Sequence, residues 1–304
     1  MVPAPDSISR LRSLSQVNVQ PNWHSWEGDL PLEQATNPCC WQQWPIAELN
    51  HKQHLAWIKG RQVRWLGQVI CVPIDLHGFE LTGLQLRLAL TWWAESAQIF
   101  VDGRLVQAGD LFDCSTRLLL SPSVQAGDQF AVAIQLVSPG HDDGALVRSL
   151  ALYESAQAQP EPGFVADELQ VLHTYLQGFY PEQLAGLHQA IDQLDWAALP
   201  DRAQFNRSLE RLREQLLPIS SLVKQRCIYL LGHAHLDLAW LWPVGETWAT
   251  AERTFESVLS LQADFPDLIF GHSTPALYDW VKTHRPQLFA RIQSQIQADR
   301  WEVI

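Results

Sequence analysis

The hydrophobic residues of this chain change their spacing along the sequence, and that change divides it into blocks of different fold class. Between residues 61 and 156 they recur at every second position, which is the spacing of a strand with one buried face. Several short strands of this kind predict an antiparallel β-sandwich over residues 61–156. The clearest apolar positions are Leu84, Leu86, Leu88 and Leu90, and then Phe130, Val132, Ile134 and Leu136.

A two-residue turn inside this block supports the sandwich. Asp102 and Gly103 stand between two runs, at residues 98–101 and 104–107, that have strand-like composition. Glycine adopts positive φ without steric cost, so Asp-Gly is a strong signal for a tight hairpin. We therefore expect neighbouring antiparallel strands on either side of this turn.

The blocks next to the sandwich follow other patterns. Residues 1–60 are interrupted by prolines and rich in tryptophan, so we expect an irregular N-terminal segment fastened onto a larger body. Residues 157–163 have the composition of a linker. Over residues 160–224 leucines recur at helical spacing, as at Leu169, Leu172 and Leu176. This spacing predicts a helical connector.

Strands and helices alternate in the last block, residues 226–304. A β-α-β-α-β order predicts a parallel sheet or barrel, and we expect it to be incomplete because the third strand is its last element. The expected fold class is multidomain α+β: an N-terminal antiparallel β-sandwich, a helical connector and the start of a parallel α/β barrel-like domain. The strands are expected at 227–232, 268–271 and 301–304, and the helices at 246–264, 274–282 and 286–299.

The segment with the clearest chemistry follows the first of these predicted strands. Residues 231–243 read LGHAHLDLAWLWP. In extended backbone, residues two apart point to the same side, so His235 and Asp237 can converge on one ion while Ala234 and Leu236 face away. We separately expect His233 to point away from the ion, in packing or in a second layer around it. Imidazole nitrogen and carboxylate oxygen both bind zinc at about 2.0–2.2 Å. By itself, a His-x-Asp tripeptide is a weak signal that often arises by chance, and it more commonly reflects a capping Asp237 and a hydrogen-bonded His235 than a metal site.

This segment resembles the class II α-mannosidases of glycoside hydrolase family 38, especially their cytosolic and vacuolar branch. In that branch a His-x-Asp-x-Ala-Trp-Leu-Trp-Pro run follows the first barrel strand and precedes a helix that carries Glu. Here the run begins at His235, and Glu246 follows it. Softer matches lie at residues 270–273, 278–280 and 300–303. The resemblance covers residues 227–304 and marks the chain as the N-terminal portion of such a protein.

The resemblance implies zinc-dependent hydrolysis, with retention, of terminal α-mannosyl residues. His235 and Asp237 would be zinc ligands, although another divalent metal is also open. Trp240 would bind the substrate by stacking on the mannose ring, and the alternative for Trp240 is a core position at the barrel mouth. Further side chains that could line the pocket are Trp242, Glu246, His272 and Ser273.

The resemblance leaves no catalytic residue to assign within the chain. The family nucleophile is an Asp that also binds the metal, and it would fall beyond Ile304, together with a fourth ligand and the acid/base. Retaining hydrolysis needs two carboxyl groups about 5–5.5 Å apart, and zinc on the sugar hydroxyls would stabilise the oxocarbenium-like transition state. We therefore expect the 304-residue chain by itself to bind zinc weakly and to lack mannosidase activity.

Two other functions stay open. The first is a non-catalytic carbohydrate-binding or interaction module, in which the sandwich and the remnant barrel recognise a sugar or another subunit. The second is a metal hydrolase similar to polysaccharide deacetylases, which also use an early Asp/His strand end. The Ala-Trp-Leu-Trp-Pro continuation argues against the second. The sequence has no spacing typical of Ser-His-Asp or Cys-His catalysis and no phosphate-binding glycine loop.

Charge and cysteine usage narrow the partners and the location. A net charge of -12 repels phosphate backbones, so we expect no nucleic acid as a partner. The resemblance implies mannose-containing oligosaccharides as partners. No apolar stretch approaches the ~20 residues of a membrane span, and residues 1–17 lack a secretory signal. The cysteines are scattered without a C-x-x-C pair, which predicts mostly buried free thiols in a reducing cytoplasm. A homo-oligomer stays open.

Overall fold

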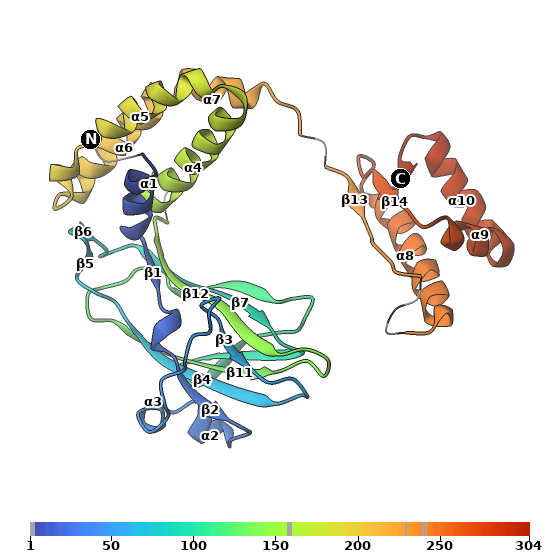
Figure 1. Cartoon of the computed structure of the whole chain (residues 1–304), viewed down its shortest axis with the longest axis horizontal. Helices are drawn as coiled ribbons and strands as arrows, with labels where there is room; N and C mark the ends of the chain where they lie inside the picture. Colours follow the sequence, from blue (N-terminus) through green and yellow to red (C-terminus); the bar gives the residue numbers. More distant parts are fainter. Residues whose placement is uncertain (1–3, 157–159, 229, 239, 241) are drawn as a thin grey trace. The chain divides into compact units, whose positions relative to one another are not determined.

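The computed structural model of the chain describes residues 4–156, 160–228, 230–238, 240 and 242–304. The chain forms two compact units, Met1–Gln225 and Arg226–Ile304 (Figure 1). Part of the predicted linker at 157–163 lies outside the described residues. So do Tyr229, in the first strand predicted for the last block, and Ala239 and Leu241 of the motif.

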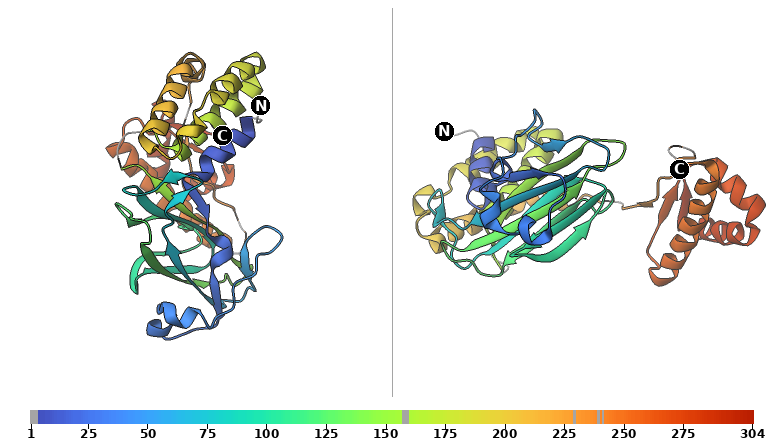
Figure 2. Two further views of the ribbon diagram at one scale, coloured as in Figure 1. Left: turned by 90° about the vertical axis from the view of Figure 1, so that its left-hand side faces the viewer. Right: turned by 90° about the horizontal axis from the view of Figure 1, so that it is seen from below.

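The first unit is built on two antiparallel sheets that face each other, as the views in Figure 2 show. In the part of the chain that the structure describes, each sheet has five strands. The first sheet has the order β1-β12-β7-β10 with β3 beside β12, and the second has the order β2-β4-β11-β8-β9. The first comprises β1 (Gln16–Asn18), β3 (Leu55–Trp57), β7 (Gln85–Trp93), β10 (Ser115–Ser121) and β12 (Gly144–Glu154). The second comprises β2 (His24–Glu27), β4 (Val63–Cys71), β8 (Ser96–Val101), β9 (Arg104–Gly109) and β11 (Gln129–Val137), and a short hairpin joins β5 (Asp75–Leu76) to β6 (Phe79–Glu80).

Alternation along the strands builds the core between the sheets. Leu86 and Leu88 of β7 are fully buried, and so are Val132 and Ile134 of β11 in the facing sheet. All four belong to one hydrophobic core, as the period-two spacing predicts for two sheets packed face to face. The prediction of antiparallel sheets is confirmed.

The predicted hairpin is also confirmed. Strands β8 and β9 pair in antiparallel fashion, with Val101 opposite Arg104. The two residues between them have positive φ, 48° at Asp102 and 77° at Gly103. Positive φ at both positions belongs to the tight turn whose twist matches the flanking strands.

Residues 1–60 are more regular than their sequence suggests, so the expectation of an irregular segment was wrong. Val17 of β1 pairs with Ala151, and Trp26 of β2 pairs with Trp65. Strands this short are held by partners far along the chain, and they leave no local hydrophobic period. The other elements of this segment include the helices α1 (Ala4–Ser13), α2 (Leu32–Ala35) and α3 (Pro38–Trp41) and the short 3-10 helix η1 (Gln20–Asn22).

The helical connector is confirmed. Glu161 caps α4, because its carboxylate accepts hydrogen bonds from the backbone N–H groups of Gly163 and Phe164. The leucines at helical spacing on α4 are buried, and they belong to the same core as the sheets. The ring of Phe205 meets Phe79 edge-on at 6.0 Å, which joins a helix to the β5-β6 hairpin. The helices are α4 (Pro162–Phe179), α5 (Leu184–Asp192), α6 (Arg202–Gln215) and α7 (Leu217–Lys224).

The second unit is a parallel sheet with helices between its strands, as predicted. Its strands have the order β13-β14-β15, and both pairings are parallel. Phe255, Phe270 and Trp301 form the centre of its core. Closure of such a sheet into a barrel stays a prediction. The elements are β13 (Gly232–His233), α8 (Val244–Asp264), β14 (Phe270–His272), α9 (Pro275–His284), α10 (Pro286–Gln297) and β15 (Trp301–Val303).

Strand β13 is shorter than the strand predicted over residues 227–232. Among the described residues of that run, Ile228 and Leu230 are exposed. Gly232 pairs with Phe270, the first residue of β14, so no described neighbouring strand is available to the residues before Gly232. The apolar run at residues 227–232 therefore predicted too long a strand, because β14 is too short to pair with the residues before Gly232.

The cysteines are free thiols, but they are not mostly buried as we expected. Cys39, Cys71 and Cys227 are exposed, and the other two are partly buried. Cys71 lies at the end of β4, where alternate residues face solvent, so its exposure follows from its position in the strand. In the described residues, no helix has the length and apolar character that crossing a membrane requires.

Candidate metal and substrate site

The polar residues of the motif gather at one edge of the parallel sheet. His235 and Asp237 follow β13, and Ser273 follows β14. The strands are parallel and in register, with His233 beside Gly271 and His272 beside Val303. Their carboxyl ends therefore meet at the same edge, which is where α/β proteins place their active sites.

His235 and Asp237 converge, as residues two apart in extended backbone should. The Nε2 atom of His235 lies 2.9 Å from Oδ1 of Asp237. Both side chains are accessible, with 69% and 47% of their surface exposed. The two atoms are of the kinds that zinc prefers, and an ion could reach them from solvent. Within the described ranges, no group of three or more His, Cys, Asp or Glu side chains could hold a metal.

A buried threonine fastens the loop that carries this pair. Thr247 is fully buried near the start of α8. Its hydroxyl accepts a hydrogen bond of 2.8 Å from the indole N–H of Trp242 and donates one of 2.6 Å to the carbonyl of Leu238. The loop is thereby tied at two points to the first turns of a helix. Nothing in the spacing of the sequence singled out Thr247, because its role depends on a backbone carbonyl nine residues earlier.

Trp240 and Glu246 both face solvent. Trp240 is 64% exposed, and its ring meets that of Trp242 edge-on at 5.6 Å. Within the described unit it is therefore not a core residue, and an indole face is available for stacking. Glu246 is exposed in the first turn of α8. The substrate-binding role of Trp240 stays a prediction.

His233 was expected to point away from His235 and Asp237, but its ring lies near that of His235. The Nδ1 atom of His233 is 2.8 Å from the carbonyl oxygen of Gly271. A carbonyl can only accept, so Nδ1 donates and, in the neutral ring, Nε2 is the acceptor. The ring centroids of His233 and His235 are 6.2 Å apart. His233 thus links β13 to β14 directly beside the His235–Asp237 pair.

His272, a sequence candidate for the pocket lining, is instead a core residue. It is 1% exposed and packs among the rings of Phe255, Phe270 and Tyr278. Burial, reinforced by the nearby His233, lowers the pKa of His272 to about 4. Its Nδ1 atom has no hydrogen-bond partner. His272 is therefore neutral near pH 7 and acts in packing.

The comparisons with known proteins agree on the class of this unit. Residues 225–304 match the family described as "Glycosyl hydrolases family 38 N-terminal domain". Alpha-mannosidase G of Dictyostelium discoideum is 26% identical over 139 residues, which is 42% of this chain and 13% of that protein. Alpha-mannosidase 2C1 of Homo sapiens is 41% identical over 69 residues, which is 23% of this chain and 7% of that protein.

By these matches the second unit is similar to a domain of glycoside hydrolases. More narrowly, residues 225–304 match the N-terminal domain of glycoside hydrolase family 38, so the predicted resemblance is confirmed for this portion of the chain. The chain is short beside these relatives, because the aligned stretch covers 13% or less of each.

Solved structures add little to this assignment. A glycosyl hydrolase family 2 member from Bacteroides cellulosilyticus is 14% identical, with a TM-score of 0.37. The alignment covers 47% of this chain and 21% of that chain. At so low a TM-score, the fold of the first unit rests on its own strand order.

Proposed function

We propose that this chain contributes the first part of the active site of a zinc-dependent, retaining α-mannosidase that acts on mannose-containing oligosaccharides. The observation that supports it is the convergence of His235 Nε2 and Asp237 Oδ1, 2.9 Å apart, at the carboxyl end of a parallel strand. The family match over residues 225–304 supports the same assignment. A cytoplasmic location stays a prediction from cysteine usage.

Five residues of the loop and of the start of α8 have separate roles in this proposal. His235 and Asp237 would hold the ion as two of its protein ligands. Trp240 would offer its exposed ring to the apolar face of a mannose unit. Thr247 and Trp242 hold the loop in position through their hydrogen bonds. When bound, zinc would supply positive charge for orienting sugar hydroxyls and stabilising the transition state.

Zinc titration of the purified 304-residue chain tests the metal assignment. We expect weak binding of one zinc ion per chain, because His235 and Asp237 provide only part of a tetrahedral set. His235→Ala and Asp237→Ala should each abolish it, since neither remaining ligand holds zinc alone. Binding is measured by competition with a chromogenic chelator.

Two exposed residues of the same unit provide matched controls. His284 and Asp279 lie on α9 and are exposed. His284→Ala and Asp279→Ala remove the same kinds of side chain and should leave the zinc affinity unchanged. If the α9 variants lose zinc while His235→Ala keeps it, the metal assignment is wrong.

A further inference from the structure

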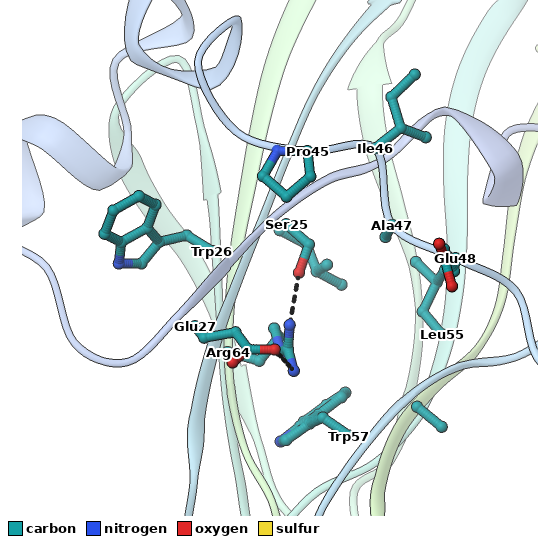
Figure 3. Close-up of a pocket in the computed structure, with 12 residues that line it drawn as sticks. Ser25, Trp26, Glu27, Pro45, Ile46, Ala47, Glu48, Leu55, Trp57 and Arg64 are labelled. Atoms are coloured by element: carbon teal, nitrogen blue, oxygen red, sulfur yellow. Dashed lines mark hydrogen bonds and ion pairs between the residues drawn. The ribbon is translucent and has the colours of Figure 1, made fainter.

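A hollow of about 550 Å³ opens in the first unit, between β2 and β4 of one sheet and β3 of the other. Its size falls within the range of about 300–1,000 Å³ that small-molecule sites occupy. It is made of residues of the first unit, and the sequence motif of the second unit has no part in it. Figure 3 shows the side chains that line it.

Arg64 is the charged centre of this hollow. The guanidinium of Arg64 donates to Ser25 Oγ at 3.1 Å and forms an ion pair of 2.9 Å with Glu27. Glu27 and Arg64 stand directly opposite each other on paired strands, so the sheet itself sets this geometry. The Arg64 side chain is only 19% exposed. These contacts use two of its five N–H donors and hold the planar group in a fixed orientation.

Apolar groups surround this polar centre. The guanidinium of Arg64 lies 6.0 Å from the ring centroid of Trp57, which is almost fully buried. Pro45 and Ile46 line the opposite side, and Ile46 is 62% exposed. Glu48 brings a second carboxylate from that side (Figure 3). The hollow therefore combines apolar walls with a few fixed donors and acceptors, which is the composition of a small-molecule site.

Charge decides which ligand class fits. An anionic ligand would meet the carboxylates of Glu27 and Glu48, and a cationic ligand would meet Arg64. A neutral hydroxyl both donates and accepts, so it can use the guanidinium and the carboxylates together. We propose that this hollow is a binding site for a neutral saccharide unit, separate from the His235–Asp237 pair. The proposal does not depend on the activity proposed for the second unit.

The test is to titrate the whole 304-residue chain with simple glycosides and to measure their binding by saturation-transfer NMR. The probes are methyl α-mannoside, methyl α-glucoside and methyl β-galactoside, with anionic methyl β-glucuronide as the charge control. The buffer contains EDTA, so that any zinc-dependent binding by the second unit is suppressed. We expect at least one neutral glycoside to saturate with a Kd of about 1–10 mM. The glucuronide should bind at least tenfold more weakly.

Variants connect that binding to the hollow. Arg64→Met keeps the aliphatic stem but removes the donors, and it should weaken binding at least tenfold. Arg64→Lys keeps the charge but loses the planar fork, and it should show a similar loss even if Arg64→Met does not fold. Arg61→Met is the matched control: Arg61 is exposed, pairs with Glu95 and should have no effect.

Glu27→Gln tests the charge argument. Glu27 is 81% exposed, so this change should leave the fold intact. An amide still accepts hydrogen bonds but carries no charge, so the neutral glycoside should bind somewhat more weakly, while the glucuronide gains affinity relative to it. The proposal is overturned if no neutral glycoside saturates below ~50 mM, if Arg64→Lys binds like the native chain, or if binding requires zinc. If sugar binding requires zinc, the sugar site would lie in the second unit, and the outcome of the zinc titration would not be affected.

Discussion

Replacement of Thr247 by valine should loosen the loop that carries His235 and Asp237. Valine has the same shape but no hydroxyl, so the indole N–H of Trp242 and the carbonyl of Leu238 both lose a partner. Each lost hydrogen bond costs about 0.5–1.5 kcal/mol, because both bonds are only partly buried. The closed loop should therefore lose about 1–3 kcal/mol relative to its opened state, which corresponds to a roughly 5- to 150-fold increase in opening.

Hydrogen–deuterium exchange measures this opening directly. The peptide covering residues 234–250 should exchange faster in Thr247→Val by a factor in that range, while peptides from β14 and α10 keep their native rates. Thr247→Ser retains the hydroxyl and should exchange close to the native rate. The reasoning is refuted if Thr247→Val and Thr247→Ser exchange alike over this peptide. Zinc affinity should fall in parallel if the loop is the metal site.

Two further outcomes follow from burial. In the folded chain His272 stays neutral down to about pH 4, whereas in the unfolded chain it takes up a proton near pH 6.5. Lowering the pH therefore favours the unfolded state, and the free energy of unfolding of the second unit should fall by about 3 kcal/mol from pH 7 to below pH 4. Urea unfolding in EDTA measures this loss, and a His272→Phe chain with the same pH slope would contradict it. In the first unit, a Cβ at Gly67 would lie 2.5 Å from the ring of Trp41, so Gly67→Ala should cost about 1–3 kcal/mol in urea unfolding. Gly140→Ala, in open space, is the control and should change stability by less than about 0.5 kcal/mol.

The sequence predicted the helices and the tight hairpin correctly, because these elements depend on residues that are close together in the chain. The helix expected over residues 246–264 is α8 (Val244–Asp264), because its apolar stripe and its charged outer face are both written in that stretch. The hairpin at Asp102-Gly103 was equally predictable, since a two-residue turn depends on two residues. By contrast, β1 was missed, because its partner is β12, more than 130 residues later.

The same division holds for the site. The convergence of His235 and Asp237 follows from alternation in extended backbone, so sequence alone could place it. The roles of His272 and Thr247 could not be predicted. Whether a histidine lines a pocket or packs in a core depends on rings from other elements, here Phe255 and Tyr278.

The continuous core of the first unit sets where the chain can be divided. The helices α4 to α6 bury leucines in the same hydrophobic interior as both sheets. A truncation between β12 and α4, which the linker-like composition near residue 160 invites, would strip one wall from that interior and should yield an aggregating product. A truncation after Gln225 falls at the boundary between the two compact units. The sandwich and its helices therefore form one folding unit, and a transplant into another protein must carry both.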